Sequence, residues 1–255
     1  MTNEANNAWE KTFRDVMDVW ITPEVIKRQE QGRLPKPLSL RQAQVLFYPD
    51  SRPTQVRIND EVRALAKVKL RDASRKNPRD LALEHEIEAF EALKLSDDDD
   101  SDCGHITIIK LRDTWYIFFD FIYNKQQCQI HLNAAREFYD VARFSVESAA
   151  WRSFVDNAFS AAELAAKALL LTMARSYIKE QASHKHIHSQ FNRFARLGNV
   201  DPKQRDTFNR LRELRPRARY LQDDFDMDHS VAVEILDAIV ALIERTEAMT
   251  RAEAC

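Results

Sequence analysis

Apolar residues recur at helical spacing through most of the second half of the chain. This period of three to four residues predicts five helices, over about residues 132–148, 151–177, 185–198, 203–220 and 229–250. The second of these helices has a stripe of mostly small side chains: Phe154, Ala158, Ala161, Ala165, Ala168 and Thr172. Small side chains let neighbouring helices approach closely, so we expect this helix to be central in an antiparallel bundle.

The first half of the chain begins with helical spacing and then changes to alternation. Two short helices are predicted, over residues 5–18 and 22–32, the second of which has Thr22 as its cap and Pro23 in its first turn. Strands are predicted over residues 45–48, 56–59, 62–71, 106–109 and 115–123. The last of them is apolar on both faces, so we expect it to be central in its sheet and covered on both sides. A further short helix is expected over residues 81–94.

These elements predict an α+β fold in two parts. Residues 1–130 are expected to form a small, mainly antiparallel sheet with short helices, and residues 131–255 an antiparallel helical bundle. The strand over residues 62–71 alternates so that its outer face is basic, with Arg63, Lys67 and Lys69. This face either contacts phosphates or is an ordinary solvated sheet face.

Composition narrows the function classes. The 255 residues include 38 Lys and Arg against 40 Asp and Glu, a net charge of -2, so any nucleic-acid site must be a local patch. Three cysteines without a CxxC pair disfavour a disulfide framework and a structural zinc site. Three glycines are too few for a glycine-rich phosphate loop. With a polar amino end and no apolar run of about 18 residues, we expect a cytoplasmic protein with no membrane partner.

Two clusters resemble metal sites without completing one. The acidic run at residues 97–102 lacks the spaced acids and central glycine of a calcium loop, which favours a solvated loop. His184 and His188 would share one face of a helix, but no cysteine or HExxH pattern accompanies them. A surface cluster is the favoured interpretation, and a place for His188 near a phosphate is the alternative. We therefore expect no metal and no cofactor.

Two strings in the helical half carry a resemblance to a known family. Ala-Ala-Glu-x3-Lys-Ala-Leu-Leu, at residues 161–170, resembles the second helix of HEPN domains, named for higher-eukaryote-and-prokaryote nucleotide-binding. Arg-Ala-Arg-Tyr, at residues 217–220, is similar to the end of the family's fourth helix. Residues 134–142 and 184–191 resemble its first and third helices, so that the resemblance covers about residues 131–250.

The resemblance implies both a fold and a function. HEPN domains are helical bundles, usually dimeric, that bind nucleotides or RNA, and many are metal-independent ribonucleases of prokaryotic toxin–antitoxin and phage-defence systems. Their catalytic signature is Arg-x4–6-His, in which the histidine handles protons at the ribose and the arginine stabilises charge on the phosphate. A homodimer that binds RNA or a nucleotide is therefore expected.

The catalytic signature is not intact in the helical half. The next histidine after Arg219 is His229, with nine residues between them, and eleven residues lie between Arg217 and His229. The intervening aspartates would repel a phosphate backbone. A segment from Arg79 to His85 fits the spacing, but it lies outside the bundle, and chance matches are expected among so many arginines.

The candidate binding residues are a set of arginines and three further side chains. They are Arg212, Arg215, Arg217, Arg219, Glu163, Lys167 and His188. Spacings of three and four place three of the arginines on one helical face, where their forks could grip phosphates, and Pro216 is expected to kink the helix. The alternative is that the aspartates at residues 223–228 pair with these arginines. Glu163 and Lys167 either form an ordinary helix pair or face the same cleft.

Three functions remain open from the sequence. The leading hypothesis is RNA or nucleotide binding by a domain whose catalytic motif is degenerate. The second is an active endoribonuclease that uses Arg217 or Arg219 with His229. The third is an interaction module, in which the bundle dimerises and the N-terminal region holds a protein partner.

Overall fold

The computed structural model describes residues 3–72, 82–96, 102–173, 183–220 and 225–251. The chain divides into two compact units, one up to Phe121 and one from Ile122 to Ala252. The first holds an antiparallel sheet with short helices and the second is helical, which confirms the predicted α+β class. No described helix is long and apolar enough to cross a bilayer. Arg79 and most of the acidic run lie outside the described residues.

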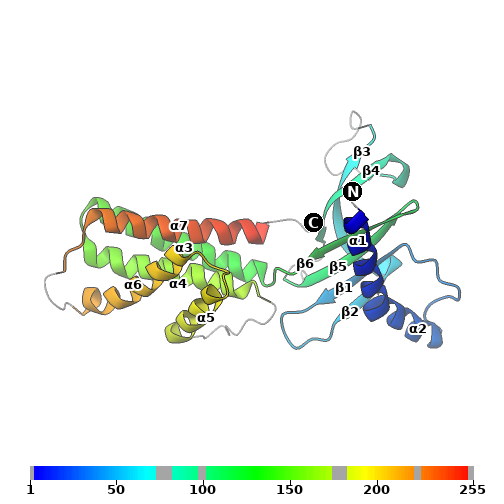
Figure 1. Ribbon diagram of the computed structural model, residues 1–255, viewed down its shortest axis with the longest axis horizontal. Coiled ribbons are helices and arrows are strands. Elements are labelled where there is room, and N and C mark those ends of the chain that lie inside the picture. The colour runs from blue at the N-terminus through cyan, green and yellow to red at the C-terminus, as the bar shows by residue number, and fades with distance from the viewer. Residues whose placement is uncertain (1–2, 73–81, 97–101, 174–182, 221–224, 252–255) are drawn as a thin grey trace. The chain divides into compact units, whose positions relative to one another are not determined.

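The N-terminal unit is built on a four-stranded antiparallel sheet (Figure 1). Its order is β2 (Gln55–Ile58), β1 (Gln42–Phe47), β5 (Gly104–Leu111), β6 (Thr114–Asp120). Helix α1 (Asn3–Val16) continues through a π-helical turn, Met17–Ile21, into α2 (Thr22–Glu30). These helices supply Val16 and Ile21 to the core that one face of the sheet forms.

The alternation of β1 separates an apolar face from a polar one. Ala43 and Val45 are fully buried against the helices. Gln44 lies between them on the opposite face and is also fully buried, with Arg57 of β2 and Thr107 of β5 as its register partners. A polar row therefore crosses the sheet on the face away from the helical core.

The helix expected over residues 81–94 is wrong, because most of that segment is a strand. β4 (Ile87–Leu95) pairs antiparallel with β3 (Ala64–Leu70) in a separate two-stranded sheet. The ladder shifts register twice and leaves Glu91 and Glu88 without a partner position. Each shift inserts one residue between core-facing positions, so Ile87, Phe90 and Leu93 share a face at a spacing of three, which imitates a helix.

The expectation that residues 115–123 form a central strand is wrong as well. β6 is an edge strand, and Phe119 and Phe121 are about half exposed. Its two apolar faces have a different cause, since Trp115 packs against Phe13 on one side and Tyr116 against Phe90 on the other. Apolar side chains on both faces indicate two covering layers, but they do not indicate a place inside the sheet.

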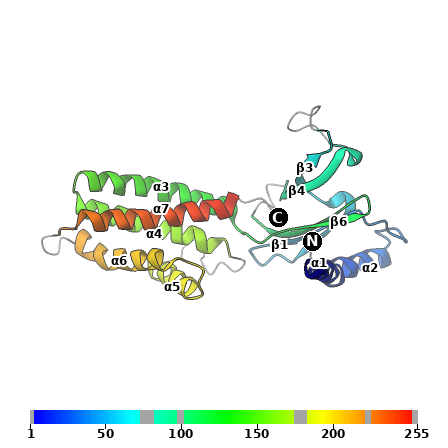
Figure 2. The same ribbon diagram turned by 45° about the horizontal axis from the view of Figure 1, so that its top comes forward.

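The second unit is a bundle of five described helices (Figure 2). They are α3 (Lys125–Glu147), α4 (Trp151–Leu171), α5 (His184–Arg196), α6 (Pro202–Arg219) and α7 (His229–Arg251). Helix α4 contacts all four others, and its residues Ala158, Ala161, Ala165 and Ala168 are fully buried. The alanine stripe is thus the centre of the bundle. Helix α6 continues through Pro216 as far as Arg219.

Candidate functional site

One face of α6 places an arginine against α4. The Arg215 Nε atom donates to the Asp156 carboxylate at 2.9 Å, and the guanidinium lies 4.3 Å from the centre of the Phe159 ring. Arg219, one turn further on, has its guanidinium 4.0 Å from the same carboxylate. Ring and carboxylate together fix the plane of the Arg215 guanidinium, whose other N–H groups have no acceptor among the described residues.

A histidine and a carboxylate meet beside the same ring. His184, the first residue of α5, has Nδ1 2.6 Å from the Glu163 carboxylate of α4. Glu163 is buried, whereas His184 is mostly exposed. Glu163 of α4 therefore pairs with His184 of α5.

His188, one turn along α5, joins α6 through a network of side chains. Its Nε2 atom is 2.7 Å from Asn209 Oδ1, and Arg212 donates to its Nδ1 atom at 3.2 Å. Asn192 and Asn209 exchange a further pair of hydrogen bonds, at 3.0 and 3.1 Å. Burial lowers the pKa of His188, and the charge of Arg212 lowers it further, against smaller opposing effects of Asn209 and Glu163. The ring is therefore neutral at neutral pH, with its proton on Nε2 and a lone pair facing Arg212.

These groups pack around two neighbouring phenylalanine rings, those of Phe159 and Phe208. The rings of Phe159 and Phe208 are 5.7 Å apart, and Phe208 lies 5.5 Å from the His188 ring. We call the polar residues around these rings the polar cluster: Asp156, Glu163, His184, His188, Asn192, Asn209, Arg212, Arg215 and Arg219. The cluster joins two carboxylates, two histidines, two asparagines and three arginines across α4, α5 and α6.

The polar cluster brings together five of the candidate binding residues predicted from the sequence, and also His184. The five are Glu163, His188, Arg212, Arg215 and Arg219. Arg217 is exposed, and its backbone carbonyl accepts a hydrogen bond from Arg152. Lys167 lies near His131, whose pKa is lowered by burial and then by the lysine charge. His229 begins α7, and no described hydrogen bond or ion pair joins it to Arg217 or Arg219.

The described aspartates after α6 do not pair with the arginines. Asp226 accepts from the backbone N–H of Met227, and Asp228 accepts from Ser230. Asp223 and Asp224 lie outside the described residues. The internal carboxylate that Arg215 uses is instead Asp156, which the sequence analysis did not single out.

Helical spacing could have pointed to some of the missed residues. Asp156 lies seven residues before Glu163, and Asn209 lies three before Arg212, so each shares a helical face with a residue that was chosen. The contact between α5 and α6 depends on tertiary packing, which carries no local signal. Among the described residues, no three His, Cys, Asp or Glu side chains are placed to hold a metal ion.

Comparison with known proteins supports the family resemblance of this half of the chain. A search of curated proteins finds no match to the chain. Residues 128–249 match the sequence model of the HEPN domain, and the N-terminal half lies outside that match. The matched range runs from α3 to α7 and contains the whole polar cluster. Residues 128–249 of this chain therefore match the HEPN domain, which confirms the resemblance found in the sequence.

Proposed function

We propose that the protein binds RNA or a nucleotide through the polar cluster, with Arg212, Arg215 and Arg219 as its phosphate contacts. The observation that carries the proposal is the fixed guanidinium of Arg215 above Phe159, held in place before any ligand arrives. An arginine whose plane is already fixed loses less conformational freedom when it grips a phosphate. The HEPN match supports a function related to nucleotides or RNA in general.

Exposure assigns different parts to the arginines. The Arg215 side chain is about one-fifth exposed, whereas Arg219 is more than half exposed and Arg212 is exposed. Arg215 would anchor one phosphate beside the Phe159 ring, and the two more exposed side chains would contact neighbouring phosphates. Arg212 also contacts the neutral His188, so the imidazole would stand beside the phosphate chain.

Binding to a short labelled RNA, measured by fluorescence anisotropy over a range of salt concentrations, tests the proposal. Replacing both Arg215 and Arg219 with alanine should weaken binding and flatten the salt dependence by about one unit per lost phosphate contact. A suitable control is the Lys203→Ala/Arg210→Ala variant, which removes two charges from the other face of α6, beside α7. Equal weakening by both variants would show that the net charge of the domain binds RNA, and not the polar cluster.

An endoribonuclease is a second candidate, and the contact between His188 and Arg212 favours it. A neutral imidazole can take a proton from a ribose hydroxyl, and an arginine within hydrogen-bond distance can stabilise the phosphate. This pair is an alternative to the pairing of Arg217 or Arg219 with His229 that the sequence predicts. We place the protein in a prokaryotic toxin–antitoxin or phage-defence setting, on the family resemblance alone.

Cleavage of the same RNA in the presence of a chelator separates the two candidates. Wild type that cleaves, together with His188→Ala that binds but does not cleave, supports catalysis by the pair in the polar cluster. Loss of cleavage in His229→Ala with retention in His188→Ala would instead restore the pairing expected from the sequence. Binding without cleavage in wild type leaves the binding function alone.

A further inference from the structure

The N-terminal unit contains a charged cavity that lies outside the HEPN domain. Its volume is about 590 Å³. Seven residues line this arginine cavity, as we call it: Arg28, Arg33, Gln55, Arg57, Asp60, Glu61 and Arg63. The volume is that of a small-molecule site, and the lining has four arginines against two carboxylates and no apolar or aromatic side chain.

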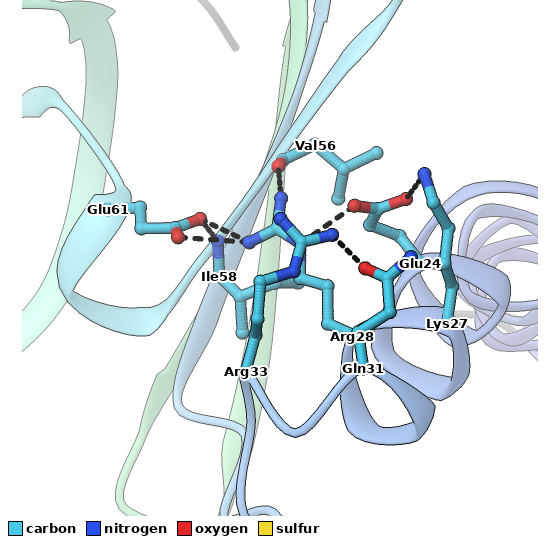
Figure 3. A network of polar contacts seen from close by, with 8 residues as sticks. All are labelled: Glu24, Lys27, Arg28, Gln31, Arg33, Val56, Ile58 and Glu61. Carbon is cyan, nitrogen blue, oxygen red and sulfur yellow. Dashed lines mark hydrogen bonds and ion pairs between the residues drawn. The ribbon is translucent and has the colours of Figure 1, made fainter.

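The Arg28 side chain is held in place by hydrogen bonds at one side of the cavity (Figure 3). Its Nε donates to Glu24 at 2.7 Å, one terminal nitrogen donates to both oxygens of Glu61 at 2.9 and 2.7 Å, and the other donates to the Val56 carbonyl at 2.6 Å. The Arg28 side chain is only 14% exposed. Each of its nitrogens thus has a protein acceptor, so its part is to hold the wall of the cavity.

Arg28 and Glu61 also satisfy backbone hydrogen-bonding groups at the edge of the sheet. β2 is an edge strand, and Glu61 accepts from the backbone N–H of Ile58, two residues after the Val56 carbonyl that Arg28 occupies. Burial raises the pKa of Glu61, but the hydrogen bonds from Arg28 and Ile58 outweigh it, so the pKa lies below its ordinary value. Glu61 is therefore ionised, and its charge is already matched by Arg28.

A buried amide beneath the cavity positions two further arginines. Gln44 is fully buried, and its Oε1 atom accepts from the Arg57 guanidinium at 3.2 Å and from the Arg63 backbone at 3.5 Å. Its Nε2 atom donates to the Arg63 carbonyl at 3.2 Å and to Thr107 Oγ1 at 3.2 Å. Burying an amide is costly unless its hydrogen bonds are made, and three of these four fix residues that line the cavity.

The charges around the cavity do not balance. Asp60 pairs with Arg41, and Glu61 pairs with Arg28. Arg33 and Arg63 have no carboxylate partner among the described residues. Arg33 instead donates to Gln31, and Figure 3 shows its guanidinium directed toward the same region as that of Arg28. Guanidinium groups that converge on one cavity repel each other, and an anion between them removes that repulsion.

We infer that the arginine cavity binds the phosphate groups of a small polyphosphate-bearing molecule, with Arg33, Arg57 and Arg63 as its ligands and Gln44 as the positioning residue of Arg57 and Arg63. A phosphate group offers three oxygens to several guanidinium groups at once, whereas a carboxylate matches a single fork. No apolar or aromatic residue lines the cavity to stack on a base or another ring, so recognition is directed at the phosphates. This site is separate from the polar cluster and does not depend on the function proposed for it.

Calorimetric titration with inorganic triphosphate tests the inference. The full chain should carry Arg215→Ala and Arg219→Ala, so that the polar cluster cannot supply the signal. Replacing both Arg33 and Arg63 with glutamine should weaken binding about tenfold or more, because two charge-assisted contacts are lost. The matched control is Arg14→Gln/Arg71→Gln, which removes two exposed arginines of the same unit and should bind as before.

A separate variant tests the role of Gln44 in positioning the arginines. Gln44→Met keeps every charge and a similar volume, so weaker binding with an unchanged circular dichroism spectrum would show that placement of Arg57 and Arg63 matters. Should Gln44→Met fail to fold, Arg57→Lys keeps the charge but loses the fork that Gln44 holds, and weaker binding is again expected. The absence of triphosphate binding at millimolar concentration, equal weakening in the control, or tighter binding of an acidic peptide would each overturn the inference.

Discussion

Replacing Ala161 with leucine should destabilise the helical bundle. Ala161 is fully buried on α4, the helix that contacts α3, α5, α6 and α7. Leucine adds three carbon atoms at a position with no exposed surface, so the helices must separate or the side chain must leave its preferred rotamer. Overpacking of this kind costs about 1–3 kcal/mol. For a unit of this size each kcal/mol lowers the melting temperature by about 4 °C, so a decrease of about 4–12 °C is expected.

Thermal melting followed by circular dichroism at the helical signal measures this decrease. Ala165→Leu, one turn along the same fully buried stripe, should behave alike. Ala248→Leu, the same substitution at an exposed position of α7, should change the melting temperature by less than about 2 °C, since surface changes stay within about 0.5 kcal/mol. A decrease no larger than that of Ala248→Leu in both buried variants would refute the close packing of helices on the alanine stripe.

Three further predictions concern other parts of the bundle. Hydrogen bonds from Arg136 lower the pKa of the buried Glu247 and outweigh the opposite effect of burial. This pair therefore stabilises the fold above about pH 4.5, and its contribution is lost as the pH falls through the lowered pKa. The difference in melting temperature between wild type and Glu247→Gln should shrink over the same pH range. Phe144 and Val141 are exposed on α3, at 68% and 48%, and changing both to glutamate should convert an expected homodimer to a monomer in light scattering. A monomeric wild type would contradict the dimer. His229→Ala should leave RNA affinity within twofold of wild type in anisotropy titrations, since it has no described contact with the polar cluster, and a larger loss would place it in the site.

The helical half was predictable because its signals are local. The alanine spacing of α4 and the order of the five helices follow from period and composition, and both appear in the structure. The N-terminal half was harder, because its pattern depends on irregular pairing. Two register shifts gave β4 the spacing of a helix, and covering layers on both faces gave an edge strand the composition of a central one. In each case the tertiary arrangement determined the meaning of the apolar positions.

The two candidate sites also differ in how far they could be predicted from the sequence. Arg215 could be found from the sequence because arginines cluster on one helix, but its partner Asp156 lies 59 residues away. The arginine cavity has no such local sign. Its arginines come from three separate segments, and the residue that joins two of them, Gln44, stands inside an apolar strand where a buried glutamine reads as an ordinary polar position. A fully buried amide at the centre of a sheet does, however, require an explanation, since its hydrogen bonds must go somewhere. Those bonds lead to the cavity, and for that reason the test of Gln44 matters as much as the tests of the arginines it holds.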